Sequence, residues 1–222
     1  MQAWLVVGTV VAGLALAYFY IASIQEAGEP ARQVAENRLL VIAAGAAAGI
    51  AIWTVVNQWA ISRRQLTIEV LRQLETDKEY AEALSRFNQA ARREDSLKTY
   101  AKGLPERFKN PPVVPKGGSP KETKRSYKKL KRFEADLADW RADEAAIHLV
   151  LNQDELLAIG IRNSILDYRL VCAFWRTALI RRKTSSADFV AELRHQTRTP
   201  TMYIEMQRFA EKLERDYYHG LL

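Results

Sequence analysis

Two long uncharged hydrophobic stretches dominate the first 61 residues. Residues 3–24 and residues 39–61 contain no Asp, Glu, Lys or Arg. Each stretch has about 22 residues, which at about 1.5 Å per residue is enough for a helix to cross a hydrocarbon core of about 30 Å. Trp and Tyr residues lie near their ends, where aromatic belts are expected. The pattern predicts a transmembrane hairpin over residues 1–61, with a short connector of mixed charge between the two spans.

The hydrophobic pattern changes to the helical spacing of a water-exposed element after the second span. Apolar residues recur at three- and four-residue intervals between positions 66 and 91, which predicts a juxtamembrane helix within residues 62–109 that runs to about residue 102. Four prolines and two glycines then fall within residues 110–120. This composition excludes regular structure and predicts a linker over residues 110–119.

The remaining residues, 120–222, are expected to form a helical domain. Ser119 and Glu122 have the spacing of a capping box, and Pro120 suits the first position of a helix. We expect this helix to end near residue 142 and a second helix to end near residue 165.

Further start signals lie toward the C-terminus. Asp167 is the expected cap of a third helix, Ser185 begins a fourth, and Thr199 precedes a fifth that runs to Gly220. No segment alternates polar and apolar residues as a half-buried strand does. The predicted fold class is therefore all-α: a two-helix transmembrane hairpin followed by a helical-bundle domain.

The net charge of +7 is concentrated in one segment. Residues 97–132 contain twelve Lys or Arg and only two acidic residues, whereas the segments around them are nearly neutral. Together with Arg63 and Arg64, this excess predicts a cytoplasmic domain by the positive-inside rule. Two spans would place both termini in the cytoplasm, so we expect a multi-pass protein of the cytoplasmic membrane.

The basic segment allows three interpretations. It could be a solvated helix face, a surface for anionic lipid, or a surface for nucleic acid. Of the two ligands, lipid is the one we expect, since the segment lies close to a predicted membrane span. The candidate lipid-binding residues are Lys121, Lys124, Arg125, Lys128, Lys129, Lys131 and Arg132.

Small residues mark the second span as a helix-packing surface. Gly45 and Gly49 form a GxxxG motif, which lets two helix backbones approach closely. The motif could pack the two spans of one chain together, or it could join two copies of the chain into a homo-oligomer.

Enzyme motifs are missing from the chain. No phosphate-binding loop, dinucleotide fingerprint, zinc-protease motif, CxxC pair or nucleophile elbow occurs. The three histidines lie far apart with no metal-ligand spacing, and the single cysteine, Cys172, sits in an apolar run typical of a core. We therefore expect no enzyme activity, no metal and no cofactor, and we expect a protein partner that the sequence does not name.

One helix carries a candidate site. His148, Asn152, Glu155 and Arg162 recur at intervals that place them on one face of the helix at residues 146–162, whose other faces are mostly apolar. Such a stripe could bind a ligand, form a satisfied interior network, or be the solvated side. Gly160, near the end of this helix, suggests a close contact with a neighbouring helix.

The same helix resembles a known family. Residues 151–161 read Leu-Asn-Gln-Asp-Glu-Leu-Leu-Ala-Ile-Gly-Ile and are followed by Ile165-Leu166-Asp167. This is similar to the signature of domain of unknown function 4760, found in bacteria and phages, whose members often have N-terminal spans and an Arg-rich juxtamembrane helix. Gln153 and Asp154 depart from its usual apolar or aromatic residues, and Tyr168 departs from a common acid. The resemblance implies an all-helical domain and no particular activity.

These observations favour a membrane-anchored, non-enzymatic helical interaction module of a bacterium or phage. One alternative is a small-ligand-sensing or catalytic domain built around His148, Asn152 and Glu155. Another, by analogy with the family's occurrence, is a membrane effector of phage defence or superinfection exclusion.

Overall fold

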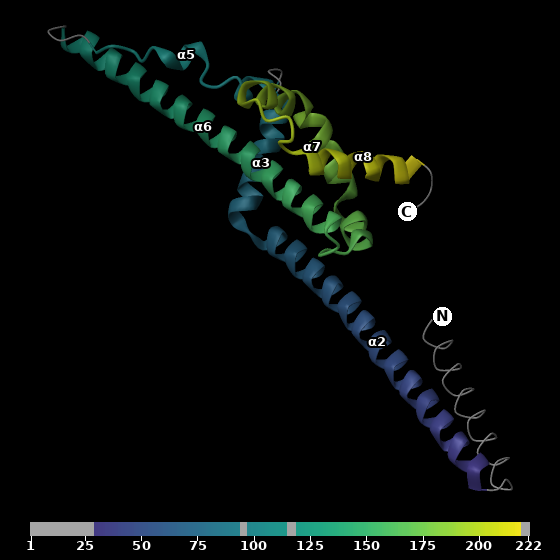
Figure 1. The fold of residues 1–222 in the computed structure, drawn as a ribbon. Coiled ribbons are helices and arrows are strands. Elements are labelled where there is room, and N and C mark those ends of the chain that lie inside the picture. Colours follow the sequence, from purple (N-terminus) through teal and green to yellow (C-terminus); the bar gives the residue numbers. More distant parts are fainter. Residues whose placement is uncertain (1–28, 94–96, 115–118, 219–222) are drawn as a thin grey trace. The chain divides into compact units, whose positions relative to one another are not determined.

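The protein is described here from a computed structural model, which describes residues 29–93, 97–114 and 119–218 (Figure 1). All regular elements in these ranges are helices, which confirms the all-α class. The helices are α2 (Glu29–Thr76), α3 (Lys78–Arg92), α4 (Lys98–Ala101), α5 (Glu106–Lys109), α6 (Pro120–Arg162), α7 (Tyr168–Thr197) and α8 (Ile204–Tyr218). The chain divides into two compact units, residues 1–62 and residues 63–222.

Helix α2 contains the second predicted span. Its large side chains between Leu40 and Ile61 are exposed, and its most apolar 18-residue window has a mean hydropathy of 2.3. In the described part of the chain, residues 37–76 form the one helix that is long and apolar enough to cross a membrane. The first predicted span, residues 3–24, lies outside the described residues, so a single such helix stands where a hairpin was predicted.

The juxtamembrane helix is shorter than the prediction to residue 102. Helix α2 ends at Thr76, and the carboxylate of Asp77 accepts hydrogen bonds from the backbone amides of Glu79 and Tyr80 at 2.8 and 3.3 Å. Asp77 is the N-cap of α3, so a local capping interaction turns one expected helix into two.

Helix α6 is one helix of 43 residues, and the predicted end near residue 142 is wrong. The capping box of Ser119 and Glu122 is present at its start as predicted. No Pro or Gly interrupts the helix between Pro120 and Gly160, so no local signal stops it. Asp167 caps α7 as predicted, by accepting hydrogen bonds from the amides of Arg169 and Leu170.

The two C-terminal helix starts differ from the prediction. Helix α7 runs through Ser185 to Thr197, because the hydroxyl of Ser186 donates to the Arg182 carbonyl within the same helix instead of capping a new one. Helix α8 begins at Ile204 rather than after Thr199. Arg198 and Tyr203, which bound the turn between the helices, have φ values of 53° and 56°.

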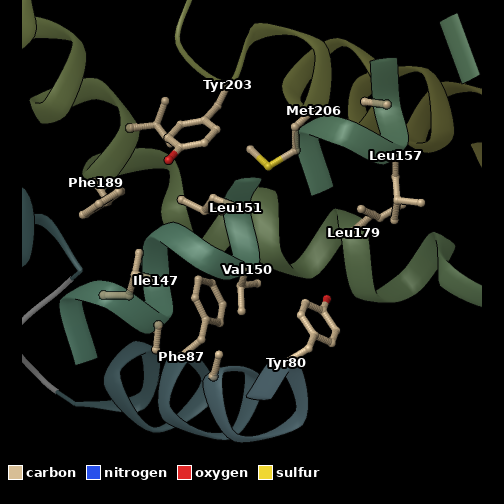
Figure 2. Packing of buried hydrophobic residues seen from close by; sticks show 14 of the residues in the cluster. Tyr80, Phe87, Ile147, Val150, Leu151, Leu157, Leu179, Phe189, Tyr203 and Met206 are labelled. Atoms are coloured by element: carbon tan, nitrogen blue, oxygen red, sulfur yellow. The ribbon is translucent and has the colours of Figure 1, made fainter. Parts of the chain in front are cut away.

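The core of the 63–222 unit is formed mainly by α3, α6, α7 and α8 (Figure 2), and the end of α2 and the short helices α4 and α5 add buried side chains to it. Phe87 of α3 packs near Ile147 and Val150 of α6, and all three are at most 1% exposed. At Gly160 a Cβ atom would lie 2.8 Å from Leu166 Cδ1. The close contact expected at Gly160 is therefore made with the turn between α6 and α7 rather than with a neighbouring helix.

Candidate functional site

The three candidate residues of α6 lie where this helix meets α8 and a surface hollow. Glu155 accepts hydrogen bonds from the backbone amides of Glu205 and Met206, at 3.2 and 2.7 Å. These amides lie in the first turn of α8, where a helix leaves its N–H groups without intrahelical acceptors. The carboxylate therefore stabilises the start of α8 both as an acceptor and as a negative charge at the positive end of the helix dipole.

His148 contacts the turn that precedes α8. Its Nδ1 atom lies 3.1 Å from the hydroxyl of Tyr203, and its ring meets the ring of Phe189 edge to face at 5.3 Å. Burial lowers the pKa of His148, although the charge of Glu144 acts in the opposite direction. Burial, with a smaller effect of the Glu155 charge, raises the pKa of the Tyr203 hydroxyl to about 12. Both rings are thus favoured in their neutral forms.

Asn152 is exposed, in contrast to the packed side chains near it. It lines a hollow of about 570 Å³ together with His148. The hollow is bordered by Glu79, Glu82, Ala83, Arg86, Ala142, Ala145, Ala146, His148, Leu149 and Asn152. The three predicted residues therefore have different surroundings. Glu155 contacts the backbone of α8, and Asn152 borders the hollow. His148 borders the hollow and also contacts the hydroxyl of Tyr203, in the turn before α8.

A buried ion pair between α6 and α7 was not predicted as a site. Asp154 of α6 and Arg182 of α7 form an ion pair with a distance of 2.8 Å between Oδ2 and Nε, and their side chains are 0% and 5% exposed. Arg182 also donates to the hydroxyl of Tyr80 at 3.2 Å and lies over the ring of Trp175 at 4.9 Å. The signal in the sequence was the departure of Asp154 from the apolar residue usual in the resembling family.

Burial raises the pKa of the Asp154 carboxyl to about 7, although the charge of Arg182 acts against it. A folded-state pKa above the unfolded one means that the bound proton stabilises the folded state. This contribution is complete below the unfolded pKa, about 3.9, and is lost as the pH rises through about 7.

We therefore expect the 63–222 unit to gain stability, relative to an Asp154→Asn variant, as the pH is lowered from about 8 to about 5. Urea unfolding of both proteins at several pH values gives the difference between their free energies of unfolding. Titrating groups that the two proteins share contribute equally to both and cancel in this difference. A difference that stays constant over this interval would contradict the raised pKa.

A second carboxylate, Asp143 of α6, joins the long helix to α3 and α4. It is 3% exposed and accepts hydrogen bonds from Arg86 at 3.3 Å, Arg93 at 2.7 Å and the Tyr100 hydroxyl at 3.1 Å. Its acceptor capacity is used by three donors, so it holds the segment after α3 against α6.

A third polar cluster joins the C-terminal part of α2 to the turn before α7. The buried hydroxyl of Thr67 accepts a hydrogen bond from the backbone amide of Asp167 at 2.7 Å, and Arg63 and Arg64 form ion pairs with the Asp167 carboxylate at 3.7 and 3.3 Å. Burial would raise the pKa of Asp167, but the amides of Leu170 and Arg169 and the charges of the two arginines lower it overall. The arginines used to predict topology are thus also structural partners of the turn before α7.

The other predicted residues lie apart from these clusters. All seven candidate lipid-binding cations are exposed on the first part of α6. Within the described residues, a Cβ atom at Gly45 or Gly49 would meet no atom within 4 Å. Cys172 is buried, and in the part of the chain that the structure describes no three His, Cys, Asp or Glu side chains gather as metal ligands.

These features define a class: an all-α protein in which a helix of membrane-spanning length continues into a helical domain. Residues 41–213 match the family model described as Domain of unknown function (DUF4760). The match covers well over half of the chain, so the protein belongs to this family. No curated protein and no solved structure matches the chain.

Proposed function

We propose that this protein is a membrane-anchored, non-enzymatic helical interaction module. The observation that carries the proposal is the continuity of α2, which contains the exposed apolar stretch and reaches Thr67 without a break. Thr67, Arg63 and Arg64 are held by Asp167, so the end of an anchoring helix is built into the fold of the 63–222 unit. The family match begins at residue 41, inside the apolar stretch, and so includes both parts.

The polar groups of the domain support an interaction role rather than catalysis. Asp143, Asp154 and Asp167 are buried, and each is bound to arginines within the fold. Glu155 is bound to the α8 backbone. A general acid or base has to be accessible to its substrate, and these carboxylates are engaged in structural contacts.

A second candidate function is the binding of a small ligand at the hollow beside His148 and Asn152. The observation that favours it is that both residues line the same hollow with Glu79, Glu82 and Arg86, which supply charges of both signs. The Asn152→Ala comparison in the Discussion distinguishes the two functions.

We expect the full chain to remain in bacterial membranes after carbonate extraction, whereas residues 63–222 alone should be soluble, since the apolar stretch of α2 lies before residue 63. At the C-terminus, a reporter that works in the cytoplasm should be active and a reporter that works in the periplasm should be inactive, because the basic excess follows the span.

Fractionation and paired cytoplasmic and periplasmic reporters measure these outcomes, with the 63–222 fragment as the matched control. Release of the full chain by carbonate would contradict the anchor. An active periplasmic reporter would reverse the orientation.

A further inference from the structure

The first part of α6 has one packed side and one free side. Thr123, Ser126, Leu130, Phe133 and Leu137 are partly buried and Trp140 is buried, at three- and four-residue intervals. Phe108 of α5 packs against Phe133 and Trp140, at ring distances of 5.8 and 6.4 Å. In Figure 1 this part of α6 lies beside the α5 segment and extends beyond α7 and α8.

The free side is strongly basic. At about 100° per residue, the seven cations fall within an arc of about 160° of the helix, roughly opposite the packed stripe. We call this surface the α6 basic face, and its members are Lys121, Lys124, Arg125, Lys128, Lys129, Lys131 and Arg132. All are exposed, and none has an acidic partner among the ion pairs of the described residues. The acidic residue nearest the start, Glu122, is bound in the capping box with Ser119.

We propose that the α6 basic face docks on the anionic lipid headgroups of the membrane that holds the chain. The proposal deepens the proposed function and rests on its membrane anchor. The contacts of Arg63, Arg64 and Thr67 with Asp167 place the membrane-proximal part of α2 near the C-terminal end of α6, so the basic face lies about 40–60 Å further along α6 and reaches the bilayer when α6 lies along its surface. At that surface each Lys or Arg gains about 1 kcal/mol from anionic lipid, equivalent to about fivefold in the docking equilibrium. Several cations on one side of a rod can approach a flat surface together, which a ring of cations around the helix could not do.

The chemistry of the face favours lipid over nucleic acid. Five of its seven cations are lysines, which act as hydrated point charges rather than as the planar forks that pair with base edges. Single-stranded nucleic acid is usually bound with aromatic rings that stack on bases. The nearest exposed ring is that of Tyr127. It lies beside the arc that the cations occupy, not within it.

The test uses the full chain in nanodiscs of neutral lipid or of neutral lipid with about one third anionic lipid. Lysines are acetylated in a short pulse and the rate at each position is measured by mass spectrometry. Lys121, Lys124 and Lys128 should react several-fold more slowly in anionic discs, and the protection should disappear at about 1 M salt, where the screening length falls to about 3 Å. Exposed Lys78 and Lys212, on α3 and α8, should react equally in both discs.

A matched pair of variants separates the face from the total charge. The triple change Lys121→Gln, Lys124→Gln and Lys128→Gln should weaken docking about a hundredfold, because each lost charge weakens it about fivefold. Lys129 and Lys131 should then lose their protection from acetylation. The triple change Lys78→Gln, Lys102→Gln and Lys212→Gln removes the same charge from exposed sites elsewhere and should leave the protection intact.

Three outcomes overturn the proposal. They are equal rates in neutral and anionic discs, equal effects of the two triple variants, or stronger protection by an RNA oligonucleotide in neutral discs than by anionic lipid. The last result would assign the face to nucleic acid. A chain that does not insert into either disc would instead refute the membrane anchor, which distinguishes that failure from a failure of docking.

Discussion

Replacing Asp154 by alanine should lower the free energy of unfolding of the 63–222 unit by about 3–5 kcal/mol. The change leaves the guanidinium of Arg182, which is 5% exposed, without its carboxylate at 2.8 Å. The cost of an uncompensated buried charge exceeds the modest net value of the ion pair itself. Urea unfolding at about pH 8, followed by the fluorescence of Trp140 and Trp175, measures the change, because these are the only tryptophans after residue 62.

A triple variant supplies the control. Asp154→Val, Arg182→Met and Tyr80→Phe together remove both charges and the hydroxyl to which Arg182 donates, and they change the summed side-chain volume only slightly. Replacement of a buried pair by apolar residues is often neutral or stabilising, so this variant should unfold near the wild-type urea concentration or above it. The opposite result would be a small loss of stability in Asp154→Ala and a large loss in the triple variant. It would show that the ion pair contributes net stability.

Replacing Glu155 by alanine should cost roughly 1–3 kcal/mol, because it leaves the buried amides at the start of α8 without their acceptor. The loss of a negative charge at the helix N-terminus adds to this cost. Thermal and urea unfolding of residues 63–222 should both show the decrease, and the abundance of the full chain in cells should fall with it.

The control for this variant is Asn152→Ala, three residues earlier on the same helix. Asn152 is exposed, so its removal should change stability by no more than about 0.5 kcal/mol. If Glu155→Ala were as stable as the wild type and yet inactive in cells, Glu155 would be a functional residue. If Asn152→Ala were stable and inactive, the hollow beside His148 would be the site to search for a ligand.

Local sequence signals predicted the local structure well. The capping residues Ser119 and Asp167 were identified from their types and spacing, because a cap bonds to amides only two or three residues away. The apolar composition of residues 39–61 likewise predicted a helix of membrane-spanning length. The predictions were weaker where a residue that can cap a helix can also lie inside one. Asp77 caps a new helix where one helix was expected to continue, and Ser185 lies inside a helix where a new one was expected to start.

The sequence by itself therefore determined the all-α class, the long apolar helix, several helix ends and the family, since each depends on neighbouring residues or on a continuous pattern. Only the tertiary structure decided which polar groups meet. Asp154 and Arg182 are 28 positions apart, and Thr67 and Asp167 are 100 apart. Their contacts depend on how the helices pack, and the spacing of residues along one helix carries no information about its neighbours. The same reason placed Glu155 at the start of α8 and left Asn152 exposed beside it.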